Sequence, residues 1–137
     1  MPIKPSIAVV DDDEAVGEAT VALLRSHGFV AKAFACADDF LNSNRLSLTT
    51  CLIADVKMNE ISGLELYGRL AARGTPIPTI LITAYPDEQT RARAFSAGVT
   101  GYLTKPFSEG ELLHCIARTA GRNVLFSPLA PRGRQCR

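Results

Sequence analysis

The stretch Ile7-Ala8-Val9-Val10-Asp11-Asp12-Asp13 places three carboxylates directly after a short apolar run. A second run, Cys51-Leu52-Ile53-Ala54, ends in the same way at Asp55. Apolar runs of this length are typical of buried strands, and in an open parallel α/β sheet ligand sites form where the strands end. Carboxylates gathered at that edge repel one another unless a cation neutralises them, and oxygen ligands suit Mg²⁺. The pattern therefore predicts a cation site built from distant parts of the chain.

Strand and helix patterns alternate five times along the chain. Strands are predicted over 7–10, 29–34, 50–54, 77–83 and 101–104, and each is followed by a helical pattern. Five strand-helix units in series favour a parallel sheet with right-handed crossovers and helices on both faces. The predicted fold class is therefore α/β, a flavodoxin-like (βα)5 three-layer sandwich with the parallel strand order 2-1-3-4-5.

The helices differ in how well their apolar stripes are defined. The first is expected to end at Gly28, the second to span about 38–43, the third to end near Gly74 and the fourth to fade at Gly98. The last helix begins with a capping-box pattern, Ser108 and Glu111. Three stripes are predicted: Val16, Ala19, Leu23 and Leu24; Leu66, Tyr67, Leu70 and Ala71; and Leu112, Leu113, Ile116, Ala117 and Ala120. The fourth helix, around 91–95, has the thinnest stripe and is expected to pack loosely.

Length and composition are those of one domain: 137 residues, 47% of them apolar and 21% charged. No apolar run approaches the roughly 20 residues that a membrane span needs, and the N-terminus does not resemble a signal peptide, so a cytoplasmic protein is expected. Cys36, Cys51, Cys115 and Cys136 form no C-x-x-C pair and suggest neither zinc nor disulfides.

Charge is distributed unevenly along the chain. Five arginines and no acid lie from Arg118 onward, which leaves ten bases against fourteen acids, a net charge of −4, in residues 1–117. The basic tail, residues 121–137, is interpreted as a solvated extension in preference to a contact with an anionic partner.

The strand ends bring a defined set of side chains to one crevice of the predicted sheet. They are Asp11 and Asp12, then Asp55, then Thr83-Ala84, and finally Lys105-Pro106. Acids, a hydroxyl and an ammonium together are suited to binding a phosphoryl group and a divalent cation.

In these residues the chain resembles the receiver domain of two-component response regulators. The resemblance covers about residues 7–120, and it predicts a receiver domain over 1–120 followed by the basic tail. It rests on Val9-Val10-Asp11-Asp12-Asp13, Asp55-Val56-Lys57-Met58 with Ser62-Gly63-Leu64-Glu65-Leu66, Ile80-Leu81-Ile82-Thr83-Ala84, and Gly101-Tyr102-Leu103-Thr104-Lys105-Pro106-Phe107. These stretches together, in this order and at the strand ends, are far more specific than any one alone.

The resemblance implies a role for each matching residue. Asp55 would accept the phosphoryl group; Mg²⁺ or Mn²⁺ would be bound directly by Asp12, Asp55 and the backbone carbonyl of Lys57, and through water by Asp11. Lys105, Thr83 and the backbone N–H of Ala84 would bind the phosphoryl group, Lys105-Pro106 would be a cis peptide, and Tyr102 would be the switch that turns inward when Thr83 moves.

The resemblance also implies partners and output. The phosphoryl donor would be a histidine kinase or a histidine phosphotransfer protein, and the output surface would be the fourth helix, the strand 101–104 and the last helix. A stand-alone receiver with an unknown downstream protein target, no nucleic acid for this chain alone, no membrane, and no enzyme activity beyond its own phosphorylation and dephosphorylation is expected.

Two departures from the family pattern concern rate. Met58 is followed by Asn59-Glu60 where the family usually has Pro-Gly, and bulky residues, Lys57 and Tyr85, occupy the positions at which the family tunes phosphoryl lifetime. The missing proline leaves φ free in that loop.

Other interpretations of the same residues stay open. An Asp triplet before a helix is often only an N-terminal cap, and His27 and His114 are interpreted as helix-surface residues. The chain could be the regulatory half of a DNA-binding transcription factor, although only 17 residues, 121–137, follow the predicted domain. A haloacid-dehalogenase-like phosphatase is disfavoured by Ala15 at its threonine position, and a flavodoxin by the acidic loop at 11–14.

Overall fold

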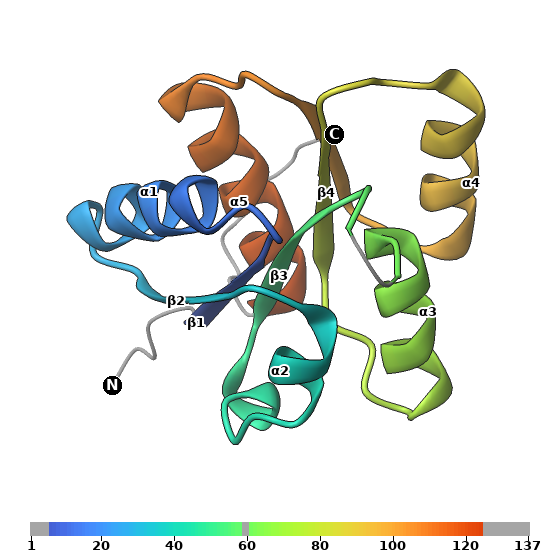
Figure 1. Ribbon diagram of the computed structural model, residues 1–137, viewed down its shortest axis with the longest axis horizontal. Coiled ribbons are helices and arrows are strands. Elements are labelled where there is room, and N and C mark those ends of the chain that lie inside the picture. Colours follow the sequence, from blue (N-terminus) through green and yellow to red (C-terminus); the bar gives the residue numbers. More distant parts are fainter. Residues whose placement is uncertain (1–5, 59–60, 125–137) are drawn as a thin grey trace.

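The structure, a computed structural model, describes residues 6–58 and 61–124 (Figure 1). One parallel sheet has the strand order β2-β1-β3-β4-β5, which confirms the predicted order. Its strands are β1 Ser6–Val10, β2 Val30–Phe34, β3 Cys51–Asp55, β4 Thr79–Thr83 and β5 Gly101–Thr104. The helices are α1 Glu14–Ser26, α2 Ala37–Leu41, α3 Gly63–Ala72, α4 Glu88–Ala97 and α5 Glu109–Val124, with a 3-10 turn, η1, at Leu46–Leu48.

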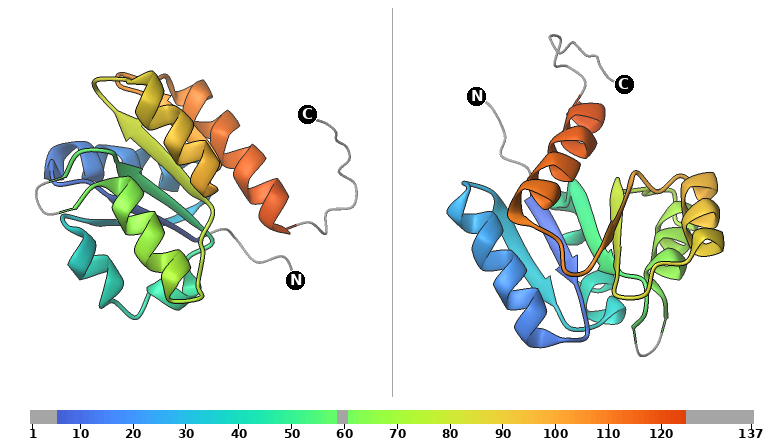
Figure 2. Two further views of the ribbon diagram at one scale, coloured as in Figure 1. Left: turned by 90° about the vertical axis from the view of Figure 1, so that its right-hand side faces the viewer. Right: turned by 90° about the horizontal axis from the view of Figure 1, so that it is seen from above.

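Helices cover both faces of the sheet, with α1 and α5 on one side and α2, α3 and α4 on the other (Figure 2). Each strand contributes to both cores because successive side chains point to opposite faces. In β1, Ile7 and Val9 pack with the α1 and α5 side, whereas Ala8 and Val10 pack with the other. The sheet is therefore the middle layer of the predicted sandwich.

The boundaries of β4 differ from the predicted range, 77–83. Regular pairing begins only at Thr79 because Pro78 has no N–H to donate to a ladder. The carbonyl of Pro78 still accepts a hydrogen bond from the N–H of Leu52, at 2.9 Å. The turn η1 was not predicted, since its three residues carry no helical repeat.

The buried face of α1 also differs from its predicted stripe. Gly17, Thr20, Val21 and Leu24 are buried, whereas Val16 and Leu23 are only half-buried and Ala19 is exposed. A polar residue can take a core position here because the Thr20 hydroxyl donates to the carbonyl of Val16, at 2.9 Å. In the other stripes, Ala71 and Ala117 are exposed and Leu113 is half-buried.

Two predictions about the later helices can be compared with the structure. α4 buries only Ala94, which confirms its thin stripe. α5 continues to Val124, four residues past residue 120, the predicted end of the receiver domain. Cys51 and Cys115 are buried and Cys36 is half-buried, all as free thiols. Asn59, Glu60, Cys136 and the tail from residue 125 lie outside the described residues.

In the described part of the chain, no helix combines the length and apolar character that a membrane crossing requires.

Candidate phosphoryl and cation site

Four strand ends meet at one edge of the sheet and bring together Asp11, Asp55, Thr83 and Lys105. Asp55 is the last residue of β3 and Thr83 the last of β4. The backbone N–H of Lys105 donates to the carbonyl of Thr83, at 2.8 Å, so the chain is held against β4 just after β5 ends. The side chains that the sequence placed at one edge are therefore held there by backbone pairing.

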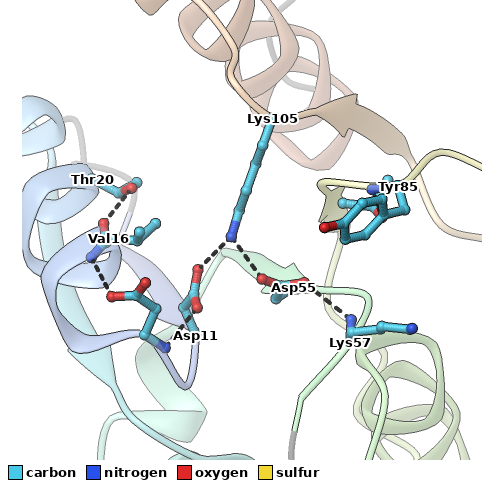
Figure 3. A network of polar contacts seen from close by, with 9 residues as sticks. Asp11, Val16, Thr20, Asp55, Lys57, Tyr85 and Lys105 are labelled. Carbon is cyan, nitrogen blue, oxygen red and sulfur yellow. Dashed lines mark hydrogen bonds and ion pairs between the residues drawn. The ribbon is translucent and has the colours of Figure 1, made fainter.

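Lys105 links the two aspartates. Its Nζ lies 2.7 Å from Oδ2 of Asp55 and 3.3 Å from Oδ2 of Asp11, and its side chain extends between them (Figure 3). The peptide bond from Lys105 to Pro106 is cis, as the resemblance implies. One ammonium thus serves two carboxylates that are separated by 44 residues in sequence.

The remaining oxygen of each aspartate accepts a backbone hydrogen bond. Oδ1 of Asp11 accepts from the N–H of Asp13, at 2.9 Å, and Oδ1 of Asp55 accepts from the N–H of Lys57, at 3.0 Å. The side chains of Asp11, Asp55 and Lys105 are only 7%, 12% and 22% exposed. All four carboxylate oxygens are therefore engaged in a site that is largely shielded from water.

Burial and charge change the pKa values of two of these groups. Burial raises the pKa of Asp11 above its ordinary value, although the Asp13 N–H and the Lys105 charge act in the opposite direction. For Lys105, burial lowers the pKa, but the hydrogen bond to Asp55 and the charges of Asp11 and Asp55 outweigh it, so that the pKa is raised. Lys105 is accordingly a stable cation at neutral pH.

Asp12, the other predicted metal ligand, makes no hydrogen bond or ion pair with Lys105. Within residues 6–58 and 61–124, no three Asp, Glu, His or Cys side chains are grouped as metal ligands. Asp12 is half-buried, and Asp13 instead caps α1 by accepting from the N–H of Val16, at 3.2 Å. Lys105 therefore neutralises part of the charge of Asp11 and Asp55, and Asp12 lies outside that ion-pair network.

The donor set nevertheless fits a hard divalent cation. Asp11 and Asp55 carry two negative charges against the one positive charge of Lys105, and Asp12 adds another carboxylate directly after Asp11. Carboxylate and carbonyl oxygens are the ligands that Mg²⁺ and Mn²⁺ prefer. The edge is therefore oxygen-rich and carries a net negative charge.

Thr83 is buried and its hydroxyl is already engaged. Oγ1 accepts a hydrogen bond from the N–H of Tyr85, at 3.0 Å. Ala84 is exposed, and Tyr85 is 79% exposed. Lys57, on the loop after β3, is also exposed, so both residues at the family's rate-tuning positions face solvent.

Tyr102, the predicted switch residue, lies partly inside the fold in this structure. The residue is half-buried and packs against the core beneath α3 and α4, and its hydroxyl oxygen is buried. That oxygen has no hydrogen-bond partner among the described residues. The ring is thus already partly inside the fold while the Thr83 hydroxyl accepts from the Tyr85 N–H.

Sequence reasoning missed one contact between distant helices. His27, at the end of α1, contacts the carboxylate of Glu109, the first residue of α5, through Nε2. His27 is exposed, as predicted, but the two residues are 82 positions apart, so no local signal could have paired them. The capping box of Ser62 and Glu65 was also missed, although its four-residue pattern is visible in the sequence.

Comparisons with known proteins agree with this geometry. The family model described as the response regulator receiver domain matches residues 7–117. Response regulator protein TmoT of Ectopseudomonas mendocina is 45% identical over 114 residues, which are 83% of this chain and 51% of that protein. Transcriptional regulatory protein FixJ of Azorhizobium caulinodans is 33% identical over 135 residues, 98% of this chain and 61% of that protein.

A solved structure, that of response regulator StyR, has a TM-score of 0.82 at 40% identity and covers 92% of this chain and 64% of that one. The chain spans about half the length of the first curated relatives it matches, 51% and 48%. Since the family model covers most of the chain and the fold and strand-end residues agree with it, this chain belongs to the family of response regulator receiver domains.

Proposed function

We propose that Asp55 accepts a phosphoryl group from a phosphohistidine on a histidine kinase or a histidine phosphotransfer protein. The observation that carries this proposal is the position of the Asp55 carboxylate, at the end of β3 and 2.7 Å from the Lys105 ammonium. Asp55 is also the only acid at the end of that strand. A nucleophile and a cation are thus adjacent in a site shielded from water.

In this reaction the phosphoryl group passes from a nitrogen of the donor imidazole to an oxygen of Asp55. A carboxylate oxygen of Asp55 forms a bond to phosphorus while the phosphorus–nitrogen bond to the donor imidazole breaks. The bonding electron pair remains on the imidazole nitrogen, and the product on Asp55 is an acyl phosphate. Because an anion approaches an anion, catalysis is mainly charge neutralisation and alignment, which Lys105 provides in part.

The cation site would be formed by Asp12, Asp55 and the backbone carbonyl of Lys57, with Asp11 acting through water. A bound Mg²⁺ or Mn²⁺ supplies positive charge that offsets charge on the phosphoryl oxygens. The net negative charge of the site supports this assignment. One oxygen of each of Asp11 and Asp55 is held by a hydrogen bond from the Asp13 or Lys57 N–H, and the other contacts Lys105, with which a bound cation would compete.

Signal transmission would begin at Thr83. Its hydroxyl accepts from Tyr85 N–H in this structure and can still donate its own proton to a phosphoryl oxygen, assisted by the N–H of Ala84. That new bond would pull the β4–α4 segment toward the site. α4 buries a single side chain, so we expect it to move first, together with Tyr102 and the adjoining surfaces of β5 and α5.

A second candidate concerns the output and not the site. The expected stand-alone receiver competes with the regulatory half of a DNA-binding transcription factor. The observation that favours the second is that the matches cover only 51% and 61% of two relatives, one of which is named as a transcriptional regulator. An open reading frame that continues past Arg137 into a helix-turn-helix domain would establish the transcription-factor form. A reading frame that stops there would favour the stand-alone receiver.

Labelling tests the proposal. Incubation with acetyl phosphate and Mg²⁺ should transfer one phosphoryl group, with release of acetate, to give an acid- and base-labile product. Asp55→Asn should abolish labelling, whereas Asp39→Asn, on the exposed surface of α2, should not. Labelling of the Asp55→Asn protein to the same extent at another residue would disprove the assignment.

A further inference from the structure

Gly63 lies unusually close to the proposed acceptor. It is the first residue of α3 and is buried. A Cβ atom at this position would be 2.5 Å from the carbonyl oxygen of Asp55 and 2.8 Å from Cδ2 of Leu81. Contacts below about 3.0 Å are essentially never found for a real Cβ, so any side chain here would force a neighbour to shift.

The start of α3 cannot easily withdraw from Asp55. The N–H of Gly63 donates to the carbonyl of Val56, at 3.1 Å, and the N–H of Val56 donates to the carbonyl of Ile82, at 2.8 Å. The helix start is also fixed by the capping box, in which Ser62 Oγ accepts from the N–H of Glu65, at 3.0 Å. The segment after Asp55 is therefore held by β4 on one side and by α3 on the other.

The two neighbours of the missing Cβ differ in how they can respond. Cδ2 of Leu81 is the end of a side chain with rotamer freedom, so it can move aside within the core. The Asp55 carbonyl belongs to the backbone of the residue whose carboxylate contacts Lys105. A displacement of that carbonyl therefore displaces the proposed acceptor itself.

We propose that Gly63 is a positioning residue for phosphoryl transfer: the absence of a side chain lets α3 begin against Asp55 and holds the acceptor carboxylate in line with Lys105. This inference rests on the proposed function, because it requires Asp55 to be the acceptor. It adds a residue that touches neither the phosphoryl group nor the cation.

Gly63→Ala tests the proposal, and Gly68→Ala is the matched control. Gly68 lies in the same helix, and a Cβ there would have no heavy atom within 4 Å. The initial rate of labelling by acetyl phosphate should fall about tenfold or more in Gly63→Ala, since a misplacement of about 1 Å can cost a hundredfold in rate. Gly68→Ala should label at the wild-type rate.

Two further measurements separate positioning from a general packing defect. The amide signal of Lys57, which donates to Asp55 Oδ1, should shift in Gly63→Ala and not in Gly68→Ala. In the double variant Gly63→Ala/Leu81→Val, which removes the Leu81 contact, labelling should stay slow. Wild-type labelling in Gly63→Ala, an unshifted Lys57 amide, or recovery in the double variant would overturn the inference.

The outcomes also distinguish the inference from the function beneath it. If the wild-type protein is not labelled at Asp55, the proposed function fails, and the Lys57 amide still reports whether Gly63 positions that residue. Should both Gly63 variants fail to fold even in sucrose, which favours the compact state, Gly63 would be assigned to fold stability and the positioning role rejected.

Discussion

Replacing Lys105 by methionine should make the protein bind Mg²⁺ more tightly. In this structure Lys105 occupies one oxygen of Asp55, at 2.7 Å, and one of Asp11, at 3.3 Å, and the other two oxygens accept backbone N–H groups. A cation that binds these carboxylates directly or through water must therefore compete with an internal cation. Methionine retains most of the length of the side chain without the charge.

The size of the effect follows from the bond that is displaced. A hydrogen bond between charged groups contributes about 1.5–3 kcal/mol. The Asp55 contact is short and only 12% and 22% of the two side chains are exposed, so the full range applies. Since about 1.4 kcal/mol corresponds to a tenfold change in affinity, the Mg²⁺ dissociation constant should fall by about tenfold to a hundredfold.

Titration calorimetry on metal-free protein measures this change, with Lys57→Met as the control. Lys57 is exposed and carries the same charge near the site, and its side chain points away from Asp55 (Figure 3). That variant should show only a small gain from the altered net charge. Equal affinity in Lys105→Met and wild type, or an equal gain in Lys57→Met, would refute the competition.

Four other outcomes are expected. Saturating Mg²⁺ should raise the melting temperature, because a ligand at a hundredfold excess over its dissociation constant adds about 2.7 kcal/mol to the free energy of unfolding. An equal gain in Asp12→Ala would contradict the assigned ligands. The pKa of Asp11 is raised in the folded protein, so the folded state favours the protonated side chain. The stability that this adds is fully present below the ordinary pKa of 3.8 and is lost as pH rises through the folded-state pKa. Asp11→Asn should therefore become the more stable protein as pH rises through that window without Mg²⁺, and pH-dependent urea melts that run parallel would argue against it. Tyr102→Phe should stabilise the fold by about 1–3 kcal/mol by removing a buried hydroxyl that has no partner among the described residues. If calorimetry shows that the variant is less stable than the wild type, the hydroxyl has a partner. Beryllofluoride, a phosphoryl mimic, should change hydrogen exchange across 85–107, and unchanged protection at saturation would mean that the protein does not signal through α4 and β5.

Much of the fold could be predicted from the sequence because its signals are local. Short apolar runs ending in acids locate the strands β1 and β3, and the Ser108 and Glu111 pattern locates the start of α5. Five such units permit few topologies, since parallel crossovers are right-handed. The strand order and the set of residues at one edge were therefore predictable before any contact was known.

Sequence patterns failed where a side chain's state depends on packing. The buried face of α1 is rotated from the predicted stripe, and Thr20 can lie on it because its hydroxyl donates within the helix. Tyr102 is half-buried, and its hydroxyl oxygen is buried with no hydrogen-bond partner among the described residues. Neither outcome has a local signature, since each is decided by the volume and the partners that other elements supply.

The site divides in the same way between sequence and tertiary structure. The sequence by itself determined which residues reach the carboxyl edge of the sheet, because strand ends are set by local apolar runs and parallel pairing aligns them. Only the tertiary structure decided that Lys105 is shared by Asp11 and Asp55, and that Gly63 lies against the Asp55 carbonyl. These relations span from 8 to 94 residues, and they depend on distances of a few ångströms that close packing of helices on the sheet fixes and that a residue pattern does not contain.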